Sequence, residues 1–213
     1  MVRFEEEVVE RYYNIMGYLT AKNIPYPSPA KRPGGKGRGE VDLLAVKLGR
    51  GRVVEDSVWC EVSVSVTALF PFICKKKPSV DEVCKLVRKF FSSGAEMVVA
   101  QYLSTRNYRY QLISSELSGR CKELLRDNMP SGSKLLSVRD TEWGIEVEHK
   151  ALDPEIEVSG VRRIEVVPFS KILERLAEKF ESKGFMEKDF ADIIMRSIQH
   201  LAKQYRTRVK HLP

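Results

Sequence analysis

The chain of 213 residues lacks the sequence features that mark several large classes of protein. No apolar run approaches the roughly 18 residues that a membrane-spanning helix requires, and the N-terminal segment is acidic, unlike a signal peptide. We therefore expect an intracellular, cytoplasmic protein that does not enter a membrane. The chain also has no Walker loop, no GxGxxG motif after a predicted strand and no GxSxG elbow, which argues against nucleotide-binding and serine-hydrolase sites.

Cysteine and histidine are scarce, whereas positive charge is in excess. The four cysteines form no CxxC pair and fit no zinc module, so we expect buried or incidental thiols. The three histidines, His149, His200 and His211, have no HxxxH spacing, which favours surface or packing roles. The formal net charge of +7 favours polyanionic partners such as nucleic acid.

The most informative stretch runs from residue 39 to residue 67. Two apolar runs, Val41 to Leu48 and Val53 to Val66, flank a glycine-containing turn and predict an antiparallel hairpin. Each run carries one acid, Asp42 in the first and Glu61 in the second, although a carboxylate in an apolar strand is costly unless it is paired, protonated or bound to a cation. Two such acids on neighbouring strands predict a site for a hard divalent cation such as Mg²⁺. The alternative is that Glu61 pairs with a nearby Arg or Lys and Asp42 caps a turn.

Two short motifs in this hairpin carry a resemblance to a known family. The first strand opens with Gly39-Glu40-Val41-Asp42, and the second contains Glu61-Val62-Ser63. This arrangement resembles the PD-(D/E)XK nuclease superfamily, most closely its Holliday-junction-resolvase-like and Mrr-like branches, over about residues 1 to 103. The resemblance implies an endodeoxyribonuclease that acts on branched or structured DNA and holds Mg²⁺ or Mn²⁺ with Asp42, Glu61 and the Val62 carbonyl. Where the family has a lysine this chain has Ser63, and a hydroxyl brings no positive charge to a phosphate.

The resemblance also implies site residues outside the hairpin. It places a glutamate of the first helix near the metal, and on the helix predicted over residues 3 to 22 Glu10 is preferred to Glu6. A replacement for the missing lysine is sought after the hairpin, because Lys47 points to the opposite face. The candidates there are Lys75, Lys76 and Lys77, for which an ordinary basic surface run is the alternative.

A segment rich in proline and glycine, residues 25 to 39, precedes Asp42 and predicts a loop. A glycine-rich backbone allows a phosphate to approach closely, and cations neutralise it. We therefore expect this loop to contact DNA through four basic side chains, with a solvated linker as the alternative: Lys31, Arg32, Lys36 and Arg38.

The predicted elements indicate an α/β fold. The first helix, the hairpin, a helix over residues 79 to 94 and a strand over residues 95 to 103 form a restriction-endonuclease-like αβββαβ core, with a mixed central sheet flanked by helices. This core spans residues 1–105, and residues 106–213 continue the same domain. In that second part we expect a helix over 110 to 127, strands near 135 to 138, 143 to 148 and 164 to 167, and helices over 168 to 181 and 186 to 206.

The two C-terminal helices are predicted either to cover the core or to form a dimer interface. A nuclease for branched DNA is expected to be a symmetric homodimer. Two alternatives to a cleaving enzyme remain open. One is a nuclease-like fold that has lost cleavage and acts as a nucleic-acid-binding or assembly subunit, which Ser63 favours. The other is a protein-interaction module or an unrelated α/β domain.

Overall fold

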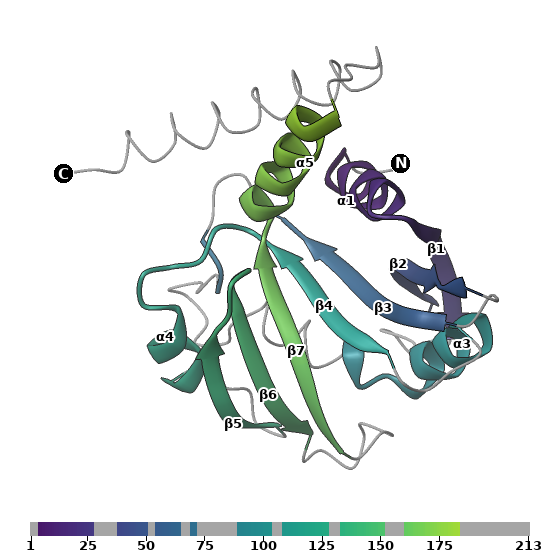
Figure 1. The fold of residues 1–213 in the computed structure, drawn as a ribbon. Helices are drawn as coiled ribbons and strands as arrows, with labels where there is room; N and C mark the ends of the chain where they lie inside the picture. The colour runs from purple at the N-terminus through teal and green to yellow at the C-terminus, as the bar shows by residue number, and fades with distance from the viewer. Residues whose placement is uncertain are drawn as a thin grey trace.

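A single mixed sheet organises the computed structural model, which describes residues 4–27, 38–50, 54–64, 69–71, 89–103, 108–127, 133–151 and 160–183. Its seven strands lie in the order β1-β2-β3-β4-β7-β6-β5 (Figure 1). The central neighbours β3, β4 and β7 are parallel, and the outer pairs on both sides are antiparallel. The strands are β1 Tyr18–Pro27, β2 Arg38–Leu48, β3 Val54–Ser63, β4 Arg109–Ser114, β5 Ser133–Asp140, β6 Ile145–Ala151 and β7 Val161–Pro168.

Helices cover both faces of the sheet, so the predicted α/β class is confirmed. α1 (Phe4–Ile15) and α5 (Phe169–Lys183) pack on one face and lie near each other in Figure 1. α3 (Ser93–Leu103) and α4 (Cys121–Asp127) contribute to the core on the other face. None of the helices in the described ranges is long and apolar enough to cross a membrane.

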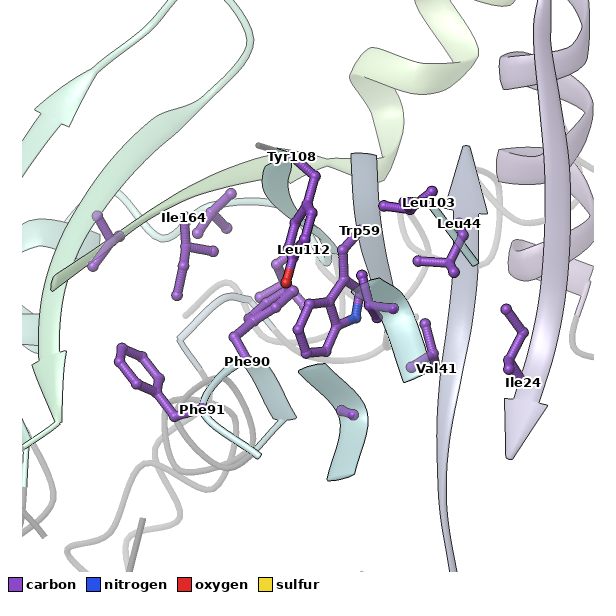
Figure 2. Close-up of a cluster of buried hydrophobic side chains, with 14 of the residues drawn as sticks. Ile24, Val41, Leu44, Trp59, Phe90, Phe91, Leu103, Tyr108, Leu112 and Ile164 are labelled. Carbon is purple, nitrogen blue, oxygen red and sulfur yellow. The ribbon is translucent and has the colours of Figure 1, made fainter. Parts of the chain in front are cut away.

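Alternation along β3 divides the core into two clusters. Val58, Cys60 and Val62 point toward α1 and α5. Trp59 points to the other face and lies at the centre of an aromatic cluster (Figure 2). Its ring centroid is 5.2 Å from that of Phe90. The face that carries Trp59 is also the face of Glu61.

The first helix is shorter than predicted. It ends at Ile15, and Gly17 takes a positive φ of 86°, which favours glycine and redirects the chain. Tyr18–Pro27 then forms β1 and pairs with β2, so the prediction of a helix to residue 22 was wrong. The predicted loop was also too long, because Pro25 and Pro27 belong to β1. As an edge strand, β1 tolerates prolines that donate no backbone hydrogen bond.

In the second half of the predicted core, helix and strand were assigned to the wrong segments. Residues 95 to 103 form most of α3 instead of a strand, and the parallel neighbour of β3 is β4. The apolar run misled because a short run of this kind suits a buried helix as well as a buried strand. Its buried members, Ala95, Val99 and Leu103, recur every four residues, which is a helical spacing. The helix predicted over 110 to 127 was likewise wrong at its start, because Arg109–Ser114 is β4 and only Cys121–Asp127 is helical.

Several later predictions were right. The hairpin is β2 and β3, the three short β segments became β5, β6 and β7, and the helix predicted from residue 168 is α5. Cys60 and Cys121 are buried, as expected of structural thiols. Outside the described residues lie residues 79 to 88 of the helix predicted over 79 to 94, the helix predicted over 186 to 206, and Cys74, Cys84, His200 and His211.

Gly94 lies in the first turn of α3, where it was expected to close the preceding helix. A Cβ at Gly94 would lie 2.2 Å from the carbonyl oxygen of Pro27, which is backbone and cannot rotate away. α3 therefore approaches the end of β1 as closely as it does only because residue 94 has no side chain.

We expect Gly94→Ala to lower the free energy of unfolding by about 1–3 kcal/mol, because either α3 or β1 must shift. Gly119→Ala is the matched control, since a Cβ there meets nothing within 4 Å, and we expect it to be close to neutral. Urea unfolding of both variants measures the difference. Equal stability of the two variants would contradict the close approach.

A histidine lies in the core without a hydrogen-bonding partner. His149 of β6 is buried, sits opposite Arg162 of β7, and packs its ring 5.4 Å from that of Phe91. Neither ring nitrogen has a hydrogen-bond partner in the described part of the chain. Burial lowers the pKa of His149 to about 4, so the folded protein holds this side chain neutral.

This burial predicts an acid dependence of stability. As pH falls below 6.5 the unfolded chain protonates His149, while the folded protein does not until about pH 4. The stabilisation present above pH 6.5 is therefore lost between pH 6.5 and 4, by about 3 kcal/mol. Urea unfolding across this range should show a shallower pH slope in His149→Leu than in wild type. Parallel curves for the two proteins would refute the assignment.

Candidate active site

The two strand acids predicted to converge are directly opposite each other. The antiparallel pairing of β2 with β3 ends at Leu43 and Cys60, and the same register continued by one residue sets Asp42 opposite Glu61. Both side chains lie on the face that carries Trp59, since side chains two residues apart share a face. The structure therefore brings Asp42 and Glu61 together at the point where the two strands separate.

One ammonium group bridges the two carboxylates. Lys89 Nζ lies 3.1 Å from Asp42 Oδ1 and 3.2 Å from Asp42 Oδ2, and it also donates a hydrogen bond to Glu61 Oε2. Lys89 is 28 residues from Glu61 in the chain and 47 from Asp42. The cluster of Asp42, Glu61 and Lys89, called the acid–lysine cluster below, is thus assembled by tertiary structure.

Donors from β3 hold one oxygen of each carboxylate. The backbone N–H of Val62 donates to Asp42 Oδ2 over 2.8 Å, and the indole Nε1–H of Trp59 donates to Glu61 Oε1 over 2.8 Å. The other oxygen of each acid, Asp42 Oδ1 and Glu61 Oε2, is directed to Lys89 Nζ. Each acid therefore has one oxygen held by a donor of β3, and the two acids meet at Lys89 Nζ, which Asp42 contacts through both of its oxygens.

Burial makes the electrostatics of this cluster strong. The side chain of Glu61 is 2% exposed and that of Asp42 is 12% exposed, whereas Lys89 reaches solvent with 35% exposed. Two carboxylates and one ammonium leave one negative charge in excess when both acids are ionised. Desolvation, reinforced by the charge of Asp42 and opposed by Lys89, raises the pKa of Glu61. Desolvation lowers the pKa of Lys89, but the two carboxylates outweigh it, so the net shift is upward and Lys89 stays charged.

The aromatic core positions Lys89. Phe90 and Phe91, which follow it directly, are fully buried, and Phe90 packs edge-on against Trp59. Trp59 in turn donates to Glu61, so one chain of contacts links the lysine backbone to the acid that its side chain meets. Ser92 then begins α3, with its carbonyl oxygen accepting from the N–H of Glu96.

Sequence analysis did not find Lys89. The replacement lysine was sought in Lys75, Lys76 and Lys77, which lie outside the described residues. One signal was available, because Phe90 and Phe91 form an aromatic pair that favours burial, which would bring the neighbouring Lys89 close to the sheet. Tyr26, which was also missed, lies close enough for the charges of the acid–lysine cluster to act on the pKa of its phenol, although burial is the largest cause of its rise.

Glu10, the helix residue expected near the metal, is elsewhere. It forms an ion pair with Lys22 and accepts a hydrogen bond from Thr20, both on β1. Lys22 is opposite Leu43 in the register of β1 and β2, and Leu43 belongs to the core beneath α1. Glu10 therefore lies on the face of the sheet opposite to the acid–lysine cluster, and the sheet separates it from Asp42.

The remaining predicted residues are placed only in part. Ser63 ends β3, opposite Ser114 of β4, and is half-buried. Arg38 begins β2 opposite Pro27, and its side chain is not described. Lys31, Arg32 and Lys36 lie outside the described residues.

The donor chemistry at the shared point suits a hard divalent cation. Mg²⁺ binds through one or two carboxylates and completes its shell with water and substrate phosphate. Within the described ranges no group of three or more His, Cys, Asp and Glu side chains converges, so protein side chains there would supply only the two carboxylates. The residues fit Mg²⁺ or Mn²⁺ provided that Lys89 Nζ withdraws from the oxygens it now contacts.

Comparison with known proteins adds no further constraint. No protein-family model, no curated protein and no solved structure matches the chain. The chemistry of the site therefore has to be argued from its own residues.

We expect Lys89 and Glu61 to be strongly coupled in stability. Replacing one partner leaves the charge of the other buried without its counterion, so Lys89→Gln and Glu61→Gln should each lower the free energy of unfolding. The double variant should lose less than the sum of the two single losses. A coupling energy of about 2 kcal/mol is expected, reduced from a fully buried pair because Lys89 is 35% exposed.

The pair of Lys22 and Glu10 is the matched control for this double-mutant cycle. Both of its side chains are more exposed than Glu61, at 31% and 24%, and its coupling energy should stay below about 1 kcal/mol. Urea unfolding of the two cycles gives both values. Equal coupling in the two pairs would show that burial does not strengthen the acid–lysine cluster.

Proposed function

We propose that the protein is a metal-dependent DNA endonuclease of the PD-(D/E)XK type, in which Asp42 and Glu61 hold Mg²⁺ or Mn²⁺. In this proposal Lys89 takes the role of the lysine that the family carries at the position of Ser63. The observation that carries it is the contact of one ammonium group, Lys89 Nζ, with both carboxylates.

The arrangement of elements supports the proposal. In chain order, α1 is followed by three antiparallel strands, then by α3, then by β4 parallel to β3. Among the described elements, this order is compatible with the αβββαβ core that the family resemblance implies. The two acids lie on the second and third of these strands, which form the hairpin that carries the resemblance.

The proposed chemistry divides among the side chains. Bound between the carboxylates, a divalent cation would supply Lewis acidity and lower the pKa of a water molecule. Asp42 and Glu61 position it, because β3 fixes one oxygen of each. Lys89 has a half-buried, partly solvent-facing side chain, so its ammonium is able to meet a phosphate oxygen and stabilise the charge that develops there.

A purely structural ion pair explains the cluster less well. Burying a carboxylate and an ammonium commonly stabilises a protein less than apolar side chains of the same size would. This cluster contains a second carboxylate, which adds repulsion to the cost. A function that requires two acids at one point accounts for their retention, whereas stability alone does not.

DNA is the proposed polyanion. The net charge of +7 favours it, as do Lys31, Arg32, Lys36 and Arg38, which precede Asp42 in the chain. Branched or structured DNA as the substrate and a homodimer as the active form both rest on the family resemblance. They remain predictions, to be checked with DNAs of several shapes and by light scattering.

A second candidate is a nuclease-like protein that binds nucleic acid or assembles with partners without cleaving. Two observations favour it: Ser63 replaces the family lysine, and Lys89 lies where a cation would bind. Such a protein would keep the ion pair permanently and use the basic segments alone.

A cleavage assay separates the two candidates. We expect wild type with Mg²⁺ or Mn²⁺ to cleave at least one of a plasmid, a linear duplex, a flap and a four-way junction. Asp42→Ala and Glu61→Ala should each slow cleavage by at least about 100-fold, because each removes a ligand of the cation. Lys89→Met should slow it to a similar extent, because it removes a positive charge at the reacting phosphate.

The control for this assay is Lys22→Gln, which removes a lysine from an ion pair on the other face of the sheet and should leave cleavage unchanged. Cleavage that persists in Glu61→Ala, or that needs no divalent cation, would sink the proposed mechanism. DNA binding by wild type without cleavage of any of the four substrates would favour the second candidate.

A further inference from the structure

We infer that Lys89 is an internal competitor of the divalent cation: its ammonium occupies the cation position in the free protein and must leave it before the cation binds. This inference rests on the cation site of the proposed function. It adds that the ammonium of Lys89 occupies that site before a cation binds. Lys89 would therefore lower the affinity of the site for the cation, in addition to any contact that it makes with the phosphate.

The hydrogen bonds of the two acids identify the contested position. Asp42 Oδ2 is held by the backbone N–H of Val62, and Glu61 Oε1 is held by the indole N–H of Trp59. Neither of these donors carries a full charge, and neither needs to move. The remaining oxygens, Asp42 Oδ1 and Glu61 Oε2, meet only at Lys89 Nζ among the contacts described. A cation that binds both acids through these oxygens therefore meets the ammonium at the same point.

The charge balance makes the competition unequal. When both acids are ionised they carry one negative charge beyond what the ammonium of Lys89 neutralises, so the site then still attracts a cation. A divalent ion at this point would neutralise both carboxylates, which a single ammonium does not. The charge balance therefore favours a divalent cation over the ammonium of Lys89 at this position. The ammonium must nevertheless be displaced before the cation binds.

The structure allows the side chain of Lys89 to leave while its backbone stays. Phe90 and Phe91 are buried immediately after it and hold the chain against the sheet. The lysine side chain itself is 35% exposed, so its ammonium is able to withdraw to water without crossing the core. Once withdrawn it still borders the site, which is where the proposed function needs it.

Two opposite substitutions test the inference. Lys89→Gln removes the competing charge and should tighten cation binding by at least about tenfold, because a nearby like charge disappears. Lys89→Arg retains the charge in a planar group that pairs with carboxylates through two hydrogen bonds, and should weaken cation binding at least about threefold. Lys22→Gln is the matched control and should leave the affinity unchanged, since its partner Glu10 lies on the other face.

The affinity is measured with Tb³⁺ as the probe, by its luminescence on excitation of Trp59, whose indole N–H is 2.8 Å from Glu61 Oε1. The chain has two tryptophans, so every variant is made in a Trp143→Phe background that leaves Trp59 alone. Displacement of Tb³⁺ by Mg²⁺ then reports the Mg²⁺ affinity. Asp42→Asn removes one of the two ligands and should abolish the signal.

An affinity of Lys89→Gln equal to or weaker than that of the parent would overturn the inference, as would an unchanged or tighter affinity of Lys89→Arg. Circular dichroism checks that Lys89→Gln folds without a cation. If it does not, Lys89→Arg alone carries the test. Failure of the proposed function looks different, because wild type would bind Tb³⁺ and Mg²⁺ with the expected order of variants and yet cleave no DNA.

Discussion

The separation of β2 from β3 beyond Leu43 and Cys60 is the constraint on which the site depends. As long as two antiparallel strands stay paired, their backbone donors are used by each other. Where this pairing stops, the N–H of Val62 becomes available, and the Asp42 carboxylate takes it in place of a carbonyl. The acid thereby replaces part of the sheet, and a backbone donor of the neighbouring strand holds it in place.

Three parts of the fold contribute to the acid–lysine cluster. β2 and β3 supply the acids, the aromatic cluster orients one of them through Trp59, and the segment before α3 supplies Lys89. Phe90 contributes to the site, because its packing against Trp59 holds the backbone directly after Lys89 against the sheet. The site and the core are therefore not independent, and loss of aromatic packing on this face would also move the charged groups.

The sequence predicts the parts of the fold whose signal is local. The hairpin was found because its two runs and turn are contiguous, and the acids stood out against apolar neighbours. The strand Tyr18–Pro27 was missed because its apolar residues continue the helical spacing past Gly17, and α3 was mistaken for a strand because it is nearly all apolar. Lys89 was missed for a different reason: its meeting with Asp42 spans 47 residues and depends on packing that no short pattern encodes.

The parallel centre of the sheet has a consequence for the order in which the polypeptide becomes structured during its synthesis. β1, β2 and β3 are contiguous hairpins that need only the first 63 residues, whereas β4 and β7, which complete the middle, end at residues 114 and 168. On the ribosome the outer edge of β3 stays uncovered until those distant segments emerge. Asp42 and Glu61 therefore emerge before residue 89, and until it appears they lack the ammonium group that contacts both of them in the folded protein.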